Sequence, residues 1–162
     1  MAECKNIMVY VETAEGNPVK VGLEMLSPAK KLADKVTAVV IGGGVADAAK
    51  EVAKAGADQV ICVDSEDYKE FNLDAYAQVL VELVKEENPE AVFVGGTQDG
   101  KDIAPVVAAK CNTGCASDVL DIKAEDGEVI YTCPLYGGTV LEDVKIKTTP
   151  QIATLRSGAF QK

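Results

Sequence analysis

The residues best suited to bind a ligand form one glycine-rich turn, made by Gly95, Gly96, Thr97 and Gly100. They follow Ala91–Val94, an apolar run typical of a strand that is buried on both faces. In open α/β sheets, ligands bind at the carboxyl ends of the strands, and the unpaired N–H groups at the start of a helix favour anions. The turn therefore predicts a nucleotide-facing site. The alternative is an ordinary strand-to-helix connection, which glycine makes at little cost.

A second glycine-rich turn, Gly42–Gly44, is followed about twenty residues later by Asp64. The pattern is similar to a dinucleotide-binding fingerprint, in which glycines approach a pyrophosphate and an acidic residue binds the ribose. However, Asp47 replaces the third glycine, and the turn follows the second expected strand instead of the first. An NAD-linked oxidoreductase is therefore the least favoured function, and an ordinary tight turn is the favoured interpretation.

Histidine is absent, which removes the commonest general base near pH 7 and the usual serine or cysteine triad. The five cysteines lack zinc or redox spacing, since three residues separate Cys111 from Cys115. Cys62 and Cys111 lie on apolar faces, where we expect buried thiols. We therefore predict no catalytic residue, no metal site and no turnover. A reducing, cytoplasmic location fits this use of cysteine.

Acidic residues dominate the composition, with 26 Asp and Glu against 16 Lys and Arg and a net charge of −10. This balance argues against binding to nucleic acid or to an anionic membrane surface. No apolar run approaches the roughly 20 residues of a membrane span, so we predict no membrane insertion.

Apolar spacing predicts that strands alternate with helices as far as Cys111. The expected strands are Asn6–Glu12, Val36–Ile41, Gln59–Val63 and Ala91–Val94, and the expected helical faces are Leu23–Ala33, Val45–Ala53, Leu73–Val84 and Ile103–Cys111. Beyond Thr113 the pattern changes to strands at Ala116–Ala124, Glu128–Leu135, Thr139–Lys147 and Gln151–Arg156. The sequence predicts the α/β class, with an open parallel sheet, helices on both faces, and added antiparallel strands at the C-terminal end. We expect the parallel sheet to be complete before Ala116. Residues 1–156 would form a single domain and residues 157–162 a linker.

Two prolines interrupt the helical patterns. Pro28 either kinks its helix, which we favour because the apolar register continues through it, or follows Ser27 as the cap of a second helix. Pro105 limits where the later helix begins. With Asp102 as the N-cap no helical hydrogen bond is lost, and with Asp99 one is lost.

Four stretches taken together resemble the electron transfer flavoprotein alpha subunit. The matches are Gly100–Pro105 to its G-[RK]-D-[LI]-A-P, Thr113–Val119 to its T-G-x-x-S-D-V, Tyr136–Gly138 to its Y-[AG]-G-N, and Pro150–Arg156 with Gly158–Phe160 to its P-x-I-A-T-[VL]-R…G-A-F. Their order and spacing agree from Asn6 to Phe160, which is almost the whole chain.

The resemblance implies a heterodimer of alpha and beta subunits that carries electrons between acyl-CoA or other flavin dehydrogenases and an acceptor. It implies an N-terminal domain with an adenine nucleotide alpha hydrolase-like, Rossmann-like fold, and a C-terminal domain, missing here, that holds most of the FAD contacts. This chain would then be a scaffold and docking module for the beta subunit. FAD would belong to the full alpha/beta complex, with none bound by this chain alone.

Tyr136, Gly137 and Gly138 are, beside the turn at residues 95–100, the candidate nucleotide- or flavin-facing residues. Cys133 stands where the family commonly has arginine, and Thr139 stands where it commonly has asparagine. An arginine could pair with a flavin, a phosphate or a partner carboxylate, which Cys133 cannot do. The alternative function is a free-standing adenine-nucleotide-binding domain that uses a crevice between residues 13–17 and 95–100.

The strand-rich tail is the expected docking surface. Val140, Val144 and Ile146 alternate only imperfectly with charged residues, so this segment is neither cleanly buried nor cleanly solvated. Edge strands must be covered, charged or paired. We therefore predict that the tail associates with the beta subunit. The alternative is that Ala116–Ala124 and Glu128–Leu135 pair with each other and cap the sheet.

Overall fold

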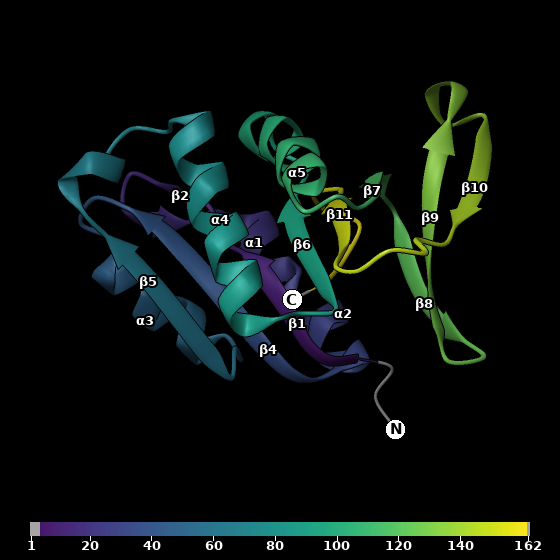
Figure 1. Ribbon diagram of the computed structural model, residues 1–162, viewed down its shortest axis with the longest axis horizontal. Helices are drawn as coiled ribbons and strands as arrows, with labels where there is room; N and C mark the ends of the chain where they lie inside the picture. The colour runs from purple at the N-terminus through teal and green to yellow at the C-terminus, as the bar shows by residue number, and fades with distance from the viewer. Residues whose placement is uncertain (1–3, 162) are drawn as a thin grey trace.

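Six parallel strands form the central sheet of the computed structural model, which describes residues 4–161 (Figure 1). Their order is β5-β4-β1-β6-β11-β7, and every neighbouring pair is parallel. The strands are β1 (Cys4–Tyr10), β4 (Ala33–Gly42), β5 (Gln59–Asp64), β6 (Ala91–Gly95), β7 (Cys115–Val119) and β11 (Gln151–Leu155). The central strands β1, β4 and β6 contain long buried apolar runs, as strands covered on both faces require.

Helices cover both faces of this sheet, as predicted. They are α1 (Lys20–Glu24), α2 (Leu26–Leu32), α3 (Ala46–Lys54), α4 (Leu73–Glu87) and α5 (Gln98–Lys110). Successive side chains of a strand point to opposite faces. Ile7 and Val9 of β1 accordingly pack with α1, α2 and α3, whereas Met8 and Tyr10 pack with α4 and α5. The α/β class is confirmed. Within residues 4–161, every helix is too short or too polar to cross a bilayer.

The parallel sheet is not complete before Ala116, and that prediction is wrong. Strand β11 lies between β6 and β7, so two strands of the tail belong to the parallel sheet. Ile152, Ala153 and Leu155 of β11 are fully buried, which is the pattern of an inner strand. The strand expected at residues 116–124 is in fact two. Asp118 adopts a positive φ of 59°, where the register with β11 shifts, and β8 begins after Leu120.

A separate antiparallel sheet, β10-β9-β8, projects to one side of the parallel sheet in Figure 1. Its strands are β8 (Asp121–Glu125), β9 (Glu128–Leu135) and β10 (Val140–Val144). Tyr131 of β9 attaches it to the core, because its ring packs edge-on against Phe93 with centroids 6.4 Å apart and its hydroxyl donates to Oε1 of Gln151 at 2.8 Å. Strands β8 and β9 pair with each other, as the alternative interpretation predicted, and β10 remains at an edge.

The helix starts differ from the expected ones. The first helical pattern breaks at Met25, between α1 and α2, and Ser27 does not cap a second helix. Pro28 lies three residues later and has no N–H to donate to the carbonyl group of Glu24. The helix is therefore interrupted near the proline, as favoured, but the break lies upstream of it. Helix α5 has Thr97 as its N-cap, so neither Asp99 nor Asp102 has that role. Pro105 therefore lies inside the helix.

Candidate functional site

The glycines after β6 are required by close packing within the chain. A Cβ on Gly95 would lie 2.6 Å from Cγ1 of Val21, and a Cβ on Gly96 would lie 3.0 Å from the carbonyl oxygen of Leu155. Gly100 is the most restricted, since its Cβ would lie 1.8 Å from the carbonyl oxygen of Gly95. These contacts account for the three glycines without a ligand, which favours the interpretation of an ordinary connection.

The start of α5 is closed by side chains of the same domain. The hydroxyl oxygen of Thr97 accepts a hydrogen bond from the N–H of Gly100 at 3.0 Å, and the hydroxyl group donates to Oε1 of Glu12. Asp99 lies in the first turn of the helix. Two carboxyl groups therefore stand beside the N–H groups that an anion would use, and the turn disfavours a phosphate.

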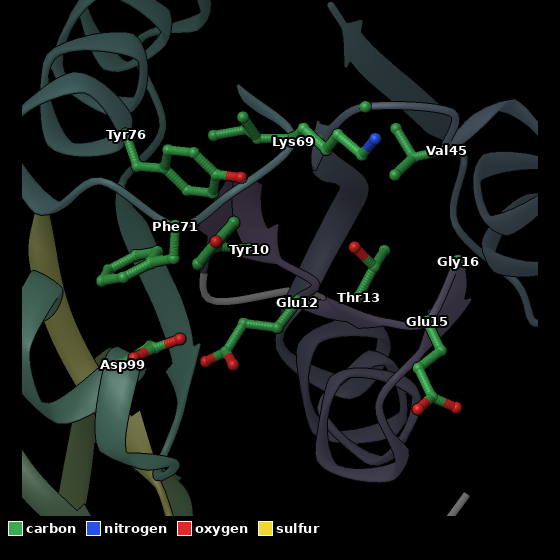
Figure 2. Close-up of a pocket in the computed structure, with 13 residues that line it drawn as sticks. Tyr10, Glu12, Thr13, Glu15, Gly16, Val45, Lys69, Phe71, Tyr76 and Asp99 are labelled. Carbon is green, nitrogen blue, oxygen red and sulfur yellow. The ribbon is translucent and has the colours of Figure 1, made fainter. Parts of the chain in front are cut away.

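A cavity of about 310 Å³ lies beside this turn, at the carboxyl ends of β1 and β4 (Figure 2). Its walls come from the end of β1, the hairpin of β2 (Thr13–Ala14) and β3 (Asn17–Pro18), the turn after β4, and one residue each of α4 and α5. Lys69 and Phe71, which follow the short helix η1 (Glu66–Tyr68), close the remaining side. Of the two segments expected to border a crevice, residues 13–17 contribute Thr13, Glu15 and Gly16 to the lining. Residues 95–100 contribute only Asp99, so Gly95, Gly96, Thr97 and Gly100 do not line the cavity.

Negative charge dominates this cavity. Glu12, Glu15 and Asp99 line it, and Lys69 is the one cation among its lining residues. Burial raises the pKa of Glu12, the hydrogen bond from Thr97 opposes that rise, and the charge of Asp99 adds to it. The arrangement can hold donors of hydrogen bonds or positive charge, and it repels phosphates.

Other residues of the chain occupy the space beside the loop after β4, where a dinucleotide would bind. The N–H of Gly44 donates to Oδ1 of Asp64 at 2.7 Å, so the acidic residue that a ribose would need is bound to the loop. A Cβ on Gly43 would lie 3.1 Å from Cα of Lys69 and 3.3 Å from the carbonyl oxygen of Ser65. This geometry favours the ordinary tight turn over a dinucleotide site.

The other candidate residues lie on a different sheet. Tyr136, Gly137 and Gly138 form the short helix η2 that joins β9 to β10, at the far end of the antiparallel sheet (Figure 1). Tyr136 is 83% exposed, and Gly137 has a φ of 67° that suits glycine. The structure therefore does not bring these residues together with Gly95, Gly96, Thr97 and Gly100.

Two of the sequence motifs meet at an ion pair that the sequence analysis did not single out. Arg156, just after β11, binds Asp118 of β7 through Nε to Oδ1 at 2.8 Å and through Nη2 to Oδ2 at 2.5 Å. The N–H of Asp118 also donates to Oγ1 of Thr154 at 2.8 Å. The bidentate contact holds the register between these strands and raises the pKa of Arg156. The available signal was an aspartate in one motif and an arginine in another.

The cysteines differ in how far they are buried. Cys62 is exposed on the edge strand β5, so its predicted burial is wrong, and Cys111 is only partly buried. The edge position explains the difference, because one side of β5 has no neighbouring strand. Within residues 4–161, no cluster of three His, Cys, Asp or Glu side chains is placed to hold a metal ion. Burial raises the pKa of the Cys115 and Cys133 thiols, which favours the protonated, less nucleophilic form.

Comparison with known proteins decides the family. A model of the electron transfer flavoprotein domain matches residues 7–162. The chain belongs to the electron transfer flavoprotein family. It is 37% identical to "Protein FixB" of Clostridium saccharobutylicum over 100% of this chain and 50% of that protein. It is 36% identical to "Electron transfer flavoprotein subunit alpha" of Clostridium acetobutylicum over 99% of this chain and 50% of that protein.

A third relative adds a named electron-transfer role. The chain is 32% identical to "Acryloyl-CoA reductase electron transfer subunit beta" of Anaerotignum propionicum, over 98% of this chain and 51% of that protein. The chain therefore spans about half the length of the curated relatives that it matches.

Sequence reasoning missed part of this electron transfer flavoprotein domain's cavity, above all Tyr10, Glu12 and Lys69. A signal existed for Glu12, because it ends the expected first strand and the carboxyl ends of parallel strands share one edge. Lys69 lies in an acidic loop without periodicity, and only the fold places it over the cavity.

Proposed function

We propose that this chain is the N-terminal domain of an electron transfer flavoprotein alpha subunit, acting as a scaffold and as a docking module for the beta subunit. In this proposal, residues 1–156 form the domain and residues 157–162 lead toward an FAD-binding domain. Two findings support this proposal. The family model matches nearly the whole chain, and the chain aligns with about half the length of an alpha subunit. The complete complex would pass electrons between acyl-CoA or other flavin dehydrogenases and an acceptor.

An exposed apolar patch at the end of the antiparallel sheet is the observation that carries the docking proposal. Its members are the large hydrophobic residues that are exposed among residues 4–161, namely Leu135, Tyr136, Val140 and Leu141. All four lie along the end of β9, η2 and the start of β10, and Leu135 is opposite Val140 in the strand register. A clustered apolar surface on an edge strand is typical of a protein interface.

Co-expression with a beta subunit tests this proposal. We expect the two chains to co-purify at equal stoichiometry and to elute together in size-exclusion chromatography. Elution of this chain alone, beside a folded beta subunit, would contradict the docking function.

FAD does not fit the described residues. The cavity of about 310 Å³ is at the small end of the ~300–1,000 Å³ that ligand pockets occupy, and its carboxyl groups oppose a pyrophosphate. We therefore propose that FAD is held only in the full alpha/beta complex, where the flavin supplies the redox chemistry. The purified chain should be colourless and should not reduce a dye with NADH. Stoichiometric FAD in its absorption spectrum, or dye reduction without an added flavoprotein, would contradict this.

The charge of the cavity also bears on the alternative function, a free-standing adenine-nucleotide-binding domain. We expect AMP and ATP to bind weakly or not at all, because three acidic residues and one lysine line the cavity. Isothermal titration calorimetry measures this directly. Micromolar ATP affinity that is lost in Lys69→Glu would favour the nucleotide-binding function instead.

We also propose a cytoplasmic location. Cys62, Cys111, Cys115 and Cys133 are not joined in disulfides, which suits a reducing compartment.

A further inference from the structure

The cavity at the carboxyl ends of β1 and β4 has on its floor a tyrosine whose ring is buried and whose hydroxyl group opens into the cavity. Tyr10 as a residue is 2% exposed, and its hydroxyl group makes no hydrogen bond with any of residues 4–161. The side chain lines the cavity, where its hydroxyl group lies between Tyr76 and the carboxyl group of Glu12 (Figure 2). A tyrosine hydroxyl group that opens into a cavity can both donate to and accept from a molecule held there. Tyr10 therefore marks the floor of this cavity as a place for a ligand.

The carboxyl groups around Tyr10 are only partly satisfied. Glu12 uses one oxygen, Oε1, to accept from Thr97. Asp99 makes no side-chain hydrogen bond or ion pair with the described residues. Figure 2 shows both carboxyl groups reaching into the same space. Burial and the charges of Glu12 and Asp99 raise the pKa of Tyr10, so its hydroxyl oxygen stays protonated and accepts without adding charge.

Aromatic rings form one wall of the cavity. Phe71 and Tyr76 line it and pack edge-to-face with ring centroids 5.0 Å apart. The hydroxyl group of Tyr76 already donates to the carbonyl oxygen of Tyr68, so this residue offers a ring more than a donor. Rings beside carboxyl groups favour a cation that has an apolar part, because the ring faces attract positive charge.

We propose that this cavity binds a small organic cation with an ammonium or guanidinium group, seated on Tyr10, Glu12 and Asp99 against the ring of Phe71. The volume of about 310 Å³ corresponds to roughly ten water molecules, enough for a ligand of about ten non-hydrogen atoms. The cation belongs either to a free amine or to an arginine or lysine side chain of another protein. Both sources present the same chemistry to the cavity.

Other ligand classes fit this cavity less well. A hard metal ion takes six or more oxygen ligands, and residues 4–161 contain no cluster placed to supply even three acidic, cysteine or histidine ligands. A phosphate meets Glu12, Glu15 and Asp99. Lys69 is the one cationic residue that lines the cavity with these three acidic residues. It forms no ion pair within the described part of the chain. Its ammonium group should compete with a bound cation.

Calorimetric titration with agmatine, which carries both an ammonium and a guanidinium group, tests the proposal at pH 7.5 and low salt. We expect a dissociation constant below about 1 mM for the purified chain. Asp99→Asn should weaken binding about tenfold, and Tyr10→Phe should weaken it severalfold without lowering the melting temperature. Lys69→Gln should tighten binding severalfold. The matched control is Asp102→Asn, a loss of the same charge on the exposed side of α5, which should change affinity less than twofold.

The pH dependence gives an independent readout. The groups that face the cavity are Tyr10, Glu12, Glu15, Lys69, Tyr76 and Asp99. Because burial raises the pKa of Glu12 above its ordinary value, acidification protonates it before an ordinary glutamate, removes negative charge and should weaken agmatine binding. Glu12→Gln should bind more weakly at pH 7.5 and lose most of that pH dependence.

A capped pentapeptide with arginine at its centre separates the two sources of the cation. Binding as tight as that of agmatine identifies a protein side chain as the ligand, and binding of agmatine alone identifies a free amine. Absence of agmatine binding at millimolar concentration would overturn the proposal. Equal affinity in the wild type, Asp99→Asn and Asp102→Asn would also overturn it, because the bound cation would then lie elsewhere.

Discussion

Replacing Val140 with glutamate should abolish co-purification of this domain with the beta subunit while its thermal unfolding stays cooperative. Val140 is 46% exposed at the start of the edge strand β10, opposite Leu135 in the register with β9. In the free domain a glutamate there remains hydrated and costs little. In an interface it would be buried without a partner, at a cost of several kcal/mol. We expect binding to weaken at least about 100-fold, since each 1.4 kcal/mol is a factor of ten.

A matched control separates this effect from added charge as such. Ala46→Glu places the same charge at an exposed apolar residue of α3, which lies on the far side of the molecule from β10 (Figure 1). This variant should co-purify with the beta subunit as the wild type does. Undisturbed co-purification of Val140→Glu would show that the interface lies elsewhere. A loss of cooperative unfolding in Val140→Glu would show that β10 is part of the core.

Most of the fold could be predicted because local patterns determine single elements. The buried runs of β1, β4 and β6 are continuous, and α4 repeats its apolar residues with helical spacing from Leu73 to Val84. The position of β11 could not be predicted in this way. Its order in the sheet depends on pairing with β6, about sixty residues earlier in the chain, and no local pattern encodes which strand lies beside which.

The candidate residues that the sequence singled out do not line the cavity, although one of their turns lies beside it. The turn at residues 95–100 does lie at the carboxyl edge of the sheet, next to a cavity. The sequence could not show that the turn needs glycine because Val21 and Leu155, from distant parts of the chain, lie too close to leave room for a side chain. Tyr10 and Glu12, which line the cavity, were predicted to lie in a buried strand. Sequence reasoning did not show that β1 ends at Tyr10 and that both residues reach the cavity there.

Gly100→Ala should cause the largest loss of stability among single substitutions in this turn. Its Cβ would lie 1.8 Å from the carbonyl oxygen of Gly95 and 3.1 Å from Oε1 of Glu12. A backbone carbonyl group cannot rotate away as a side chain can, so α5 must shift from β6. We expect the free energy of unfolding to fall by at least about 3 kcal/mol. The melting temperature should fall by about 6–12 °C.

Gly114→Ala is the matched control for this prediction. Its Cβ would lie 3.5 Å from Cγ2 of Ile146, an ordinary van der Waals contact, and Gly114 has no positive φ. Alanine there should change the melting temperature by less than about 2 °C. Differential scanning calorimetry of both variants without any ligand is the decisive measurement. If Gly100→Ala melted like the wild type, the packing account of this turn would be wrong, and a ligand that needs close approach to Gly100 would become the better explanation for the glycine.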